Sequence, residues 1–499
     1  MNYGELLNFV APETLVVLAA FGALLFDMMA MRGSTLRKRM RAAAWLSLLG
    51  CGAAALAILH TPQTTPPGYL DGMLVLNPLA HLVKLVLLGL TAFTVLLSVE
   101  STFTDHVGEY FALLLLATVG MMFLVSTENI LLIFVSLELL SLCLYIMTAF
   151  KKESIQSSEA ALKYFLFGGM SAAFMLFGLS LVYGLAGELH LTKIALALQG
   201  QPLDALRLVA IVMVVIGLGF KIAAVPFHLW APDAYEGAPT PTAAFIASGS
   251  KVASFFILAK VMMVGFAAAP GAGNGGWSNY SQVWIPLIAA VAALSIVLGN
   301  VAAIVQNSVR RLLAYSAIAQ AGYMLIGLLA DTQQGMASLL YYVCTYALTT
   351  LGAFGVVAVV EDGSGSEKFS AFAGLGKRSP LLSFCMLVFL LSLAGIPPLA
   401  GFFGKVYLFA AMLNSTPKEL RLLWLVILAI GMSAISLYYY LQVLKQIYVV
   451  EATAPASALP LARSASLAIG LLAGGVIVLG CAPNLLLSRL LAALQASGL

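Results

Sequence analysis

Apolar segments of about 20 residues recur along nearly the whole chain, and only short polar connections separate them. Hydrophobic residues make up 62% of the 499 residues and charged residues only 9%, whereas an ordinary soluble domain carries about 25% charged residues. A membrane strand needs roughly 9–11 residues that alternate in polarity, so these longer, uniformly apolar runs indicate helices. We therefore expect an all-α polytopic membrane protein.

The segment lengths predict about 14 transmembrane helices, because roughly 20 apolar residues are needed for a helix to cross a bilayer. The segment 380–412 is too long for one straight crossing, so we expect it to tilt or break. The predicted spans lie near residues 12–31, 41–60, 77–99, 109–126, 129–150, 160–185, 205–231, 241–268, 283–305, 311–330, 335–361, 380–412, 421–448 and 465–487.

Basic residues are divided unevenly between the two sets of alternating loops. Cytoplasmic loops carry the excess of lysine and arginine, so the bias of 14 against 5 predicts that both termini face outward. The richer side carries Arg32, Arg37, Lys38, Arg39, Arg41, Lys151, Lys152, Arg310, Arg311, Lys368, Lys377, Arg378, Lys445 and Arg463. The other side carries Lys193, Arg207, Lys418, Arg421 and Arg489. The N-terminal stretch has no basic region before its first apolar run, so we expect no removable signal peptide.

Five ionisable side chains lie inside these apolar segments: Glu138, Lys163, Lys221, Lys251 and Lys405. A charge at the centre of a bilayer costs roughly 2.5–3.5 kcal/mol on insertion scales, and such residues usually mark an ion or proton pathway. The five residues are therefore our candidates for proton translocation.

Prolines accompany two of the lysines. Pro226 follows Lys221 by about one turn, and Pro397 and Pro398 precede Lys405. Proline removes a backbone donor and breaks or kinks a helix, and transporters build ion sites beside such breaks. An ordinary kink beside a lysine that is paired with a carboxylate remains the alternative. Two broken helices suggest two related halves, near spans 4–8 and 9–13, inverted across the membrane.

A Glu–Lys contact inside the membrane could switch the charge of the lysine. At about 4 Å and an effective dielectric near 20 the attraction is roughly 4 kcal/mol, so making and breaking the contact would load and release a proton. A static ion pair of Glu138 is the alternative.

Lys163 lies near the end of its span with Glu159 one turn before it, so a solvated surface pair remains open. Asp233 and Glu236 fall in the predicted loop between spans 7 and 8, and we expect them to order that loop.

Four other polar residues receive a structural interpretation. Lys84 and His81 share a face near the end of span 3, and we expect both to be solvated. Lys260 lies on the face of span 8 opposite Lys251 and is expected to extend outward to the interface. His228, after the break in span 7, could relay protons or be a hydrogen-bonded structural residue.

Sequence motifs for metals, nucleotides and nucleic acid are missing. Cys51, Cys143, Cys344, Cys385 and Cys481 all lie in apolar segments without a CxxC or Cys/His pattern, so no zinc, iron–sulfur or haem site is expected. The sequence contains no GxGxxG after a strand and no Walker A motif. We expect no cofactor or metal bound by this chain, and no nucleic-acid partner.

Several segments resemble the antiporter-like membrane subunits of respiratory complex I. They are SLELLSLCLYIM, ALKYFLFGG, GFKIAAVPFHLWAPDAYEGAPTPTAAFIASGSKVASFF, SVRRLLAYSAIAQAGYML, FAGLGKRSPLL and LAGIPPLAGFFGK. The resemblance covers nearly the whole chain and implies a 14-helix fold with two inverted five-helix repeats. The glutamate and lysines of the family's polar axis match Glu138, Lys163, Lys221, Lys251 and Lys405.

The resemblance implies a proton-translocating subunit in the membrane arm of NADH:quinone oxidoreductase, in a bacterial inner membrane, beside sister antiporter-like subunits. Glu138 would tune Lys221, and Lys405 would connect the axis to a membrane face or a neighbouring subunit. NADH, FMN, iron–sulfur clusters and quinone would be bound by other subunits. We expect three N-terminal helices at 1–106, repeats at 107–268 and 269–450, and a final helix at 451–499. A subunit of an Mrp-type Na⁺/H⁺ antiporter and a purely structural membrane scaffold are the alternatives.

Overall fold

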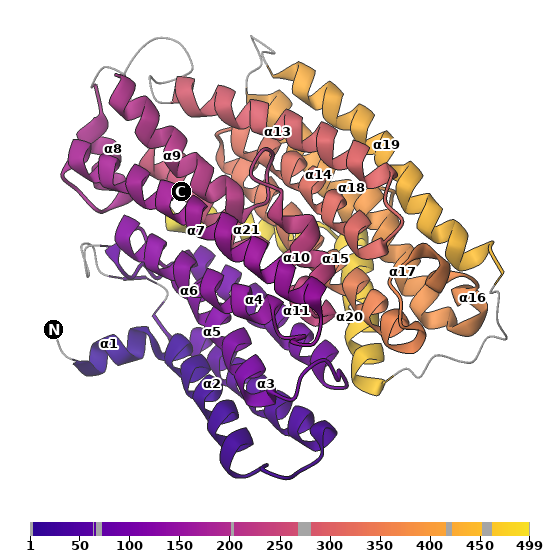
Figure 1. The fold of residues 1–499 in the computed structure, drawn as a ribbon. Coiled ribbons are helices and arrows are strands. Elements are labelled where there is room, and N and C mark those ends of the chain that lie inside the picture. The colour runs from indigo at the N-terminus through magenta and orange to yellow at the C-terminus, as the bar shows by residue number, and fades with distance from the viewer. Residues whose placement is uncertain are drawn as a thin grey trace.

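The computed structural model describes residues 3–62, 64–65, 72–200, 204–267, 281–415, 422–451 and 462–498, and these residues fold into a bundle of helices (Figure 1). In the first half the helices are α1 Tyr3–Phe9, α2 Ala11–Met29, α3 Leu36–His60, α4 Pro78–Ser98, α5 Val107–Val125, α6 Ile130–Thr148, α7 Ile155–Ala186, α8 Leu191–Leu198, α9 Ala205–Lys221, α10 Trp230–Gly237, α11 Thr240–Ala247, α12 Gly249–Lys260 and the π-helix η2 Val261–Gly265. In the second half they are α13 Ser281–Ile304, α14 Val309–Leu329, α15 Gln333–Ser364, the 3₁₀-helix η3 Phe369–Phe372, α16 Leu375–Arg378, α17 Pro380–Ala394, α18 Ala400–Ser415, α19 Leu423–Tyr448, α20 Arg463–Cys481 and α21 Asn484–Ser497.

The number of crossings agrees with the prediction. Within the described residues 12 helical segments are long and apolar enough to cross a membrane. Counted as one crossing each, the broken pairs α9–α10 and α17–α18 bring the number to the predicted 14. The prediction for the last span was wrong at its end: α20 stops at Cys481, and a separate helix, α21, begins at Asn484. Pro483 lies between them and cannot donate to the preceding turn.

Three segments form the centre of the bundle. In the most apolar 18-residue part of Thr240–Gly265 every residue is buried, and in the corresponding parts of Val309–Leu329 and Gln333–Ser364 94% of the residues are buried. These segments are α11–α12–η2, α14 and α15, and the remaining helices surround them. Figure 1 shows α2 and α3 (indigo) at one edge of the bundle and α19 (orange) at another. A helix that is buried on all sides needs no polar face toward solvent. Polar side chains in these central helices therefore serve some purpose other than solvation.

Two helices are interrupted at the predicted prolines. α9 ends at Lys221, residues 222–229 form turns, and α10 begins at Trp230. α17 ends at Ala394, and Gly395 follows with φ +87°, a conformation that favours glycine. The Gly395 N–H donates to the carbonyl of Leu391 at 3.1 Å and so closes the end of α17.

The bundle has two ends at which its loops meet. Ser101, Lys151, Pro239, Arg310 and Glu361 line one shared cavity, so the loops after α4, α6 and α10, the start of α14 and the end of α15 lie together; we call this end the arginine-rich face. At the opposite face the N–H of Glu128 donates to Gly72 O, and the N–H of Leu191 donates to Glu128 O, both at 2.9 Å. The loops therefore alternate as predicted. Lys418 and Arg421, which contributed to the orientation prediction, lie outside the described residues.

Candidate functional site: a buried polar axis

Lys221 ends α9 at the first helix break and points toward α6. Its Nζ lies 3.9 Å from Glu138 Oε1, and it donates a hydrogen bond to Ser141 Oγ. The lysine side chain is almost wholly buried, while that of Glu138 is 25% exposed. Glu138 Oε1 itself has no hydrogen-bond partner within the described chain. A separation of 3.9 Å is an attraction without a hydrogen bond, so small side-chain movements could make or loosen the contact.

Lys251 lies in the central segment α12 and is 1% exposed. Its Nζ donates to the carbonyl of Ala317 on α14 at 2.6 Å and lies 5.5 Å from the centroid of the Tyr346 ring on α15. No carboxylate forms an ion pair with it among the residues that the structure describes. Lys251 is therefore held by a carbonyl dipole and a ring face rather than by an opposite charge.

Lys405 lies one turn into α18, beside the second helix break. Its Nζ donates to the carbonyls of Leu393 and Ala394 at 3.0 and 3.1 Å, and to Ser433 Oγ at 2.8 Å. It also lies 4.9 Å from the centroid of the Tyr323 ring. The two carbonyls belong to the last turn of α17, where a helix exposes unpaired acceptors. Lys405 thus occupies the gap that the break creates.

A network of polar side chains on α14, α15 and α19 lies next to Lys405. Gln320 Nε2 donates to the same Leu393 carbonyl at 2.9 Å and to the Tyr440 hydroxyl at 3.3 Å. The Tyr342 hydroxyl donates to Gln320 Oε1 at 2.5 Å, and Tyr440 shares a hydrogen bond with Ser316. Ser316 precedes Ala317, whose carbonyl accepts from Lys251. The network therefore spans the region between the sites of Lys251 and Lys405.

Sequence reasoning did not identify this network. Its members are neutral and common in helices, so the charge criterion could not select them. A second neutral group lies nearby, in which Asn300 Nδ2 donates to the Tyr323 hydroxyl and Asn300 Oδ1 accepts from the Tyr439 hydroxyl, both at 3.0 Å. The signal that could have found them is the concentration of Tyr, Gln and Asn in apolar spans.

Lys163 lies toward the arginine-rich face, apart from the buried lysines. Its side chain is 41% exposed and pairs with Glu159 at 2.7 Å and with Asp233 at 2.8 Å. Asp233 also pairs with Arg311 at 3.1 Å, and Arg311 reaches Glu236 at 2.6 Å. The structure therefore places Lys163 in an ion-pair network that anchors α10.

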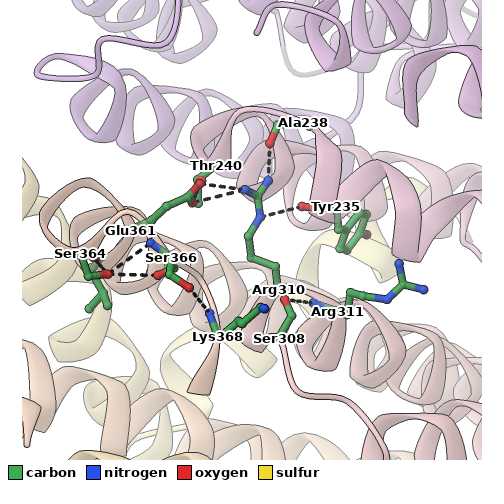
Figure 2. A network of polar contacts seen from close by, with 11 residues as sticks. Tyr235, Ala238, Thr240, Ser308, Arg310, Arg311, Glu361, Ser364, Ser366 and Lys368 are labelled. Carbon is green, nitrogen blue, oxygen red and sulfur yellow. Dashed lines mark hydrogen bonds and ion pairs between the residues drawn. The ribbon is translucent and has the colours of Figure 1, made fainter. Parts of the chain in front are cut away.

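Arg310 forms a second, more deeply buried network at this face (Figure 2). Its guanidinium donates to the carbonyls of Tyr235 and Ala238 and pairs with Glu361 at 3.2 Å. Glu361 also accepts from Thr240 Oγ1 at 2.6 Å. These bonds join the turn between α10 and α11 to α14 and α15, which positions the broken helix against the bundle centre.

Two predictions of solvated lysines were wrong. Lys84 is 1% exposed and lies 2.6 Å from Glu13 of α2, and His81 is buried as well. Lys260 is also 1% exposed, and its Nζ lies 3.0 Å from Glu128 Oε1. In both cases a carboxylate from a distant part of the sequence compensates the charge, which helix-face geometry alone could not reveal.

His228 lies in the turns after the first break and is half-buried. Its Nδ1 has no hydrogen-bond partner within the described chain, and no bond joins it to Lys221. Among the described residues no group of three His, Cys, Asp or Glu side chains is arranged to hold a metal ion. The polar groups present suit proton transfer between side chains, because lysine and carboxyl groups gain and lose protons, while hydroxyl groups both donate and accept hydrogen bonds.

Buried lysines beside two broken helices, in a bundle that contains 12 helical segments long and apolar enough to cross a membrane among its described residues, define the class of antiporter-like membrane proteins. The family described as "NADH:quinone oxidoreductase/Mrp antiporter, TM" matches residues 127–436. This matched region contains all five candidate residues, from Glu138 to Lys405.

Relatives and solved structures narrow the class. NADH-quinone oxidoreductase subunit N 2 of Acidobacterium capsulatum is 55% identical over 98% of this chain and 99% of its own. NADH-quinone oxidoreductase subunit N of Desulforamulus reducens is 41% identical over 75% of each chain. A chain of respiratory complex I from Thermus thermophilus is 33% identical with a TM-score of 0.77, over 96% of this chain and 99% of that one.

The fold also occurs outside complex I. A chain of the Mrp complex from Dietzia has a TM-score of 0.81 over 98% of this chain and 97% of its own, at 19% identity. That likeness shows the fold alone. The chain belongs to the subunit N family of NADH-quinone oxidoreductase, the antiporter-like membrane subunits of the H⁺-translocating complex I.

Proposed function

We propose that protons move through this subunit along an axis formed by Glu138, Lys221, Lys251 and Lys405, with Lys163 at its edge. The observation that carries the proposal is the contact of 3.9 Å between Lys221 and Glu138 beside the broken end of α9. The three lysines on the axis are buried. Lys221 faces a carboxylate, whereas Lys251 and Lys405 donate to backbone carbonyls. Groups held in such different environments can exchange a proton when one environment changes.

The Glu138 contact would set the charge of Lys221. At about 4 Å and an effective dielectric near 20, a carboxylate favours a lysine's charged form by roughly 4 kcal/mol. Movement of Glu138 away from Lys221 would remove this attraction, and Lys221 would then release its proton. Ser141 Oγ accepts from Lys221, so the amine keeps a hydrogen-bond partner in either state.

The neutral network would conduct between Lys251 and Lys405. The Gln320 amide and the Tyr342 and Tyr440 hydroxyls form consecutive hydrogen bonds, and hydroxyl groups both donate and accept. Tyr346 Oη is buried with no hydrogen-bond partner in the described part of the chain. Its ring lies against Lys251, so a water at this hydroxyl would extend the network to the lysine.

The partners are proposed from the family, and the orientation is proposed from the distribution of basic residues. The chain would assemble with sister antiporter-like subunits, while NADH, FMN, iron–sulfur clusters and quinone would bind to other subunits. We propose that the arginine-rich face is cytoplasmic and that both termini lie on the outer side of a bacterial inner membrane, because basic residues concentrate at that face. His228, beside the break at Pro226, is a candidate relay between the arginine-rich face and Lys221.

The repeat boundaries remain a proposal. α9–α10 and α17–α18 are both broken helices, which supports repeats at 107–268 and 269–450. Pro226 occupies the first break, and Pro397 and Pro398 occupy the second. Residues 268–280, where the boundary between the two repeats falls, lie outside the described residues.

The test is proton translocation by complex I that carries Lys221→Ala in this chain, reconstituted in vesicles. We expect assembly and NADH:quinone reductase activity in detergent to be retained, while proton uptake per NADH falls. Loss of assembly with normal translocation by the residual complex would instead indicate a structural ion pair. Glu188→Gln serves as the control, since this carboxylate is 44% exposed, faces Lys193 and lies off the axis.

A further inference from the structure

A second buried charged group lies outside the axis, between α2 and α4. Lys84 Nζ is 2.6 Å from Glu13 Oε1, and both side chains are 1% exposed. His81, one turn before Lys84 on α4, is 7% exposed. Glu13 Oε2 is buried and has no hydrogen-bond partner among the residues described. The carboxylate therefore has one oxygen engaged by the ammonium and one oxygen available to a proton.

Helix α4 carries a row of buried hydroxyls that leads away from this pair. Thr91, Thr94 and Ser98 are each 0% exposed, and at 100° per residue they lie with Lys84 within an arc of about 80°. The rise of 1.5 Å per residue places Ser98 about 21 Å from Lys84 along the helix. These residues place polar groups on one buried face of α4, with the buried Leu87 between Lys84 and Thr91.

Hydroxyls on neighbouring helices extend the row. Thr91 Oγ1 shares a hydrogen bond of 2.9 Å with Thr118 Oγ1 of α5, and Ser98 Oγ shares one of 3.0 Å with the Tyr110 hydroxyl. Thr242 Oγ1, on α11, is buried without a hydrogen-bond partner in the described residues. Each of these groups can both donate and accept a hydrogen bond, as proton relay requires.

The row ends at the arginine-rich face beside a polar cavity of about 400 Å³. Ser101 and Phe103 line this cavity from the α4–α5 loop. The Phe103 ring packs against Tyr110 with 5.0 Å between centroids. Arg310 and Glu361 form part of the opposite wall, and Figure 2 shows them meeting beside Thr240 and Ala238. The cavity is large enough for several waters, and Phe103, which lines it, lies between the cavity and Tyr110.

We propose that Glu13 is a second proton-binding site of this subunit, connected to the cavity at the arginine-rich face through the hydroxyl row of α4. A proton from the cavity passes along Ser98, Thr94 and Thr91 and binds to the free Oε2 of Glu13, which becomes a neutral carboxyl. It leaves by the same route. Lys84 keeps its proton throughout, so the site gains and loses one unit of positive charge.

The remaining charged groups on helices packed against α2 and α4 form no ion pair with this site among the described residues. On α2 and α3 these are Asp27, Arg37, Lys38, Arg39, Arg41 and His60, and on α5, α12, α15, α20 and α21 they are Glu109, Lys251, Lys260, Glu361, Asp362, Arg463 and Arg489. His81 is the titratable group that lies near the Glu13–Lys84 pair. The exchange is therefore carried by Glu13 with His81 as its titratable neighbour.

The test is infrared difference spectroscopy of the intact complex after a step to lower pH, in light and heavy water. We expect a protonated-carboxyl band that shifts in heavy water and is lost in Glu13→Gln. Thr91→Val removes a hydroxyl of the row while keeping its shape, and it should slow the appearance of the band several-fold. The band should persist in Glu138→Gln, which separates this site from the proposed axis.

Two further variants separate the proposed effect from misfolding and from a wrong assignment of the infrared band. Glu13→Gln combined with Lys84→Met removes both charges, so no unpaired charge stays buried, and NADH:quinone reductase activity reports assembly. Glu109→Gln, a carboxyl 43% exposed at the start of α5, should leave the band unchanged. A difference spectrum identical in wild type and Glu13→Gln, or a band whose rate is unaffected by Thr91→Val, would overturn the proposal.

Discussion

The Lys221 ammonium lies 3.9 Å from the Glu138 carboxylate, at the point where α9 breaks. The lysine has a second partner in Ser141, whereas the facing oxygen of Glu138 has no hydrogen bond within the described chain. The carboxylate is therefore the less constrained member of the pair. A mobile carboxylate beside a fixed amine is the arrangement in which a small displacement changes the charge state of a lysine.

Replacing Glu138 with glutamine should impair translocation without unfolding the subunit. The amide keeps the size of the side chain but removes an attraction of about 4 kcal/mol, and 1.4 kcal/mol already corresponds to about a tenfold change in a protonation equilibrium. We expect proton uptake per NADH in vesicles to fall by about tenfold or more. Glu188→Gln, at a carboxyl that is 44% exposed and faces Lys193, is the matched control, and equal effects of the two variants would contradict the special role of Glu138.

Gln320 should be needed for both stability and proton transfer. Gln320→Leu leaves the Tyr342 hydroxyl without its acceptor and the Leu393 carbonyl with one donor fewer, at a cost of about 1–3 kcal/mol. We expect a lower melting temperature for the purified complex and slower proton uptake. Gln306→Leu, just after the end of α13, is the control because among the described residues its side-chain amide donates only to the Ala302 carbonyl. Unchanged proton uptake with Gln320→Leu would show that the network is not part of the proton pathway.

Lys405 should tolerate arginine better than methionine as far as folding is concerned. Lys405→Met leaves the carbonyls of Leu393 and Ala394 without this donor in a buried gap, whereas arginine retains donors there. We expect methionine to lower stability by about 1–3 kcal/mol and both variants to reduce proton uptake, since arginine does not release its proton. Thermal unfolding and uptake assays on the same preparations measure the two effects. Full uptake with arginine would show that Lys405 need not deprotonate.

Asp233 should contribute a small, salt-sensitive stabilisation. Asp233→Asn removes the pairs with Lys163 and Arg311, and a partly exposed ion pair is worth up to about 1 kcal/mol. We expect the melting temperature to fall slightly at low salt and the difference to shrink at high salt, because salt screens exposed charges. Glu188→Gln, which faces Lys193 at 3.9 Å, is the control. A loss of uptake as large as that of Lys221→Ala would place Asp233 on the pathway itself.

The number of spans and the positions of both helix breaks could be predicted from the chain itself. Segment length decides whether a helix crosses a bilayer, and a proline withholds a backbone donor wherever it stands. These are local properties, so the breaks around Pro226 and Pro397 follow from the residues present. α21 was missed because its residues continue the apolar run of α20, and only Pro483 marks the junction.

The sequence by itself therefore determined the class of fold and the residues that are costly to place in a membrane, from Glu138 to Lys405. Only the tertiary structure decided which charges are compensated. Lys84 meets Glu13 and Lys260 meets Glu128 across long separations in the chain, while Lys251 meets a carbonyl and a tyrosine ring. The physical reason is that the free energy of a buried charge depends on its neighbours in space, and helix packing chooses those neighbours.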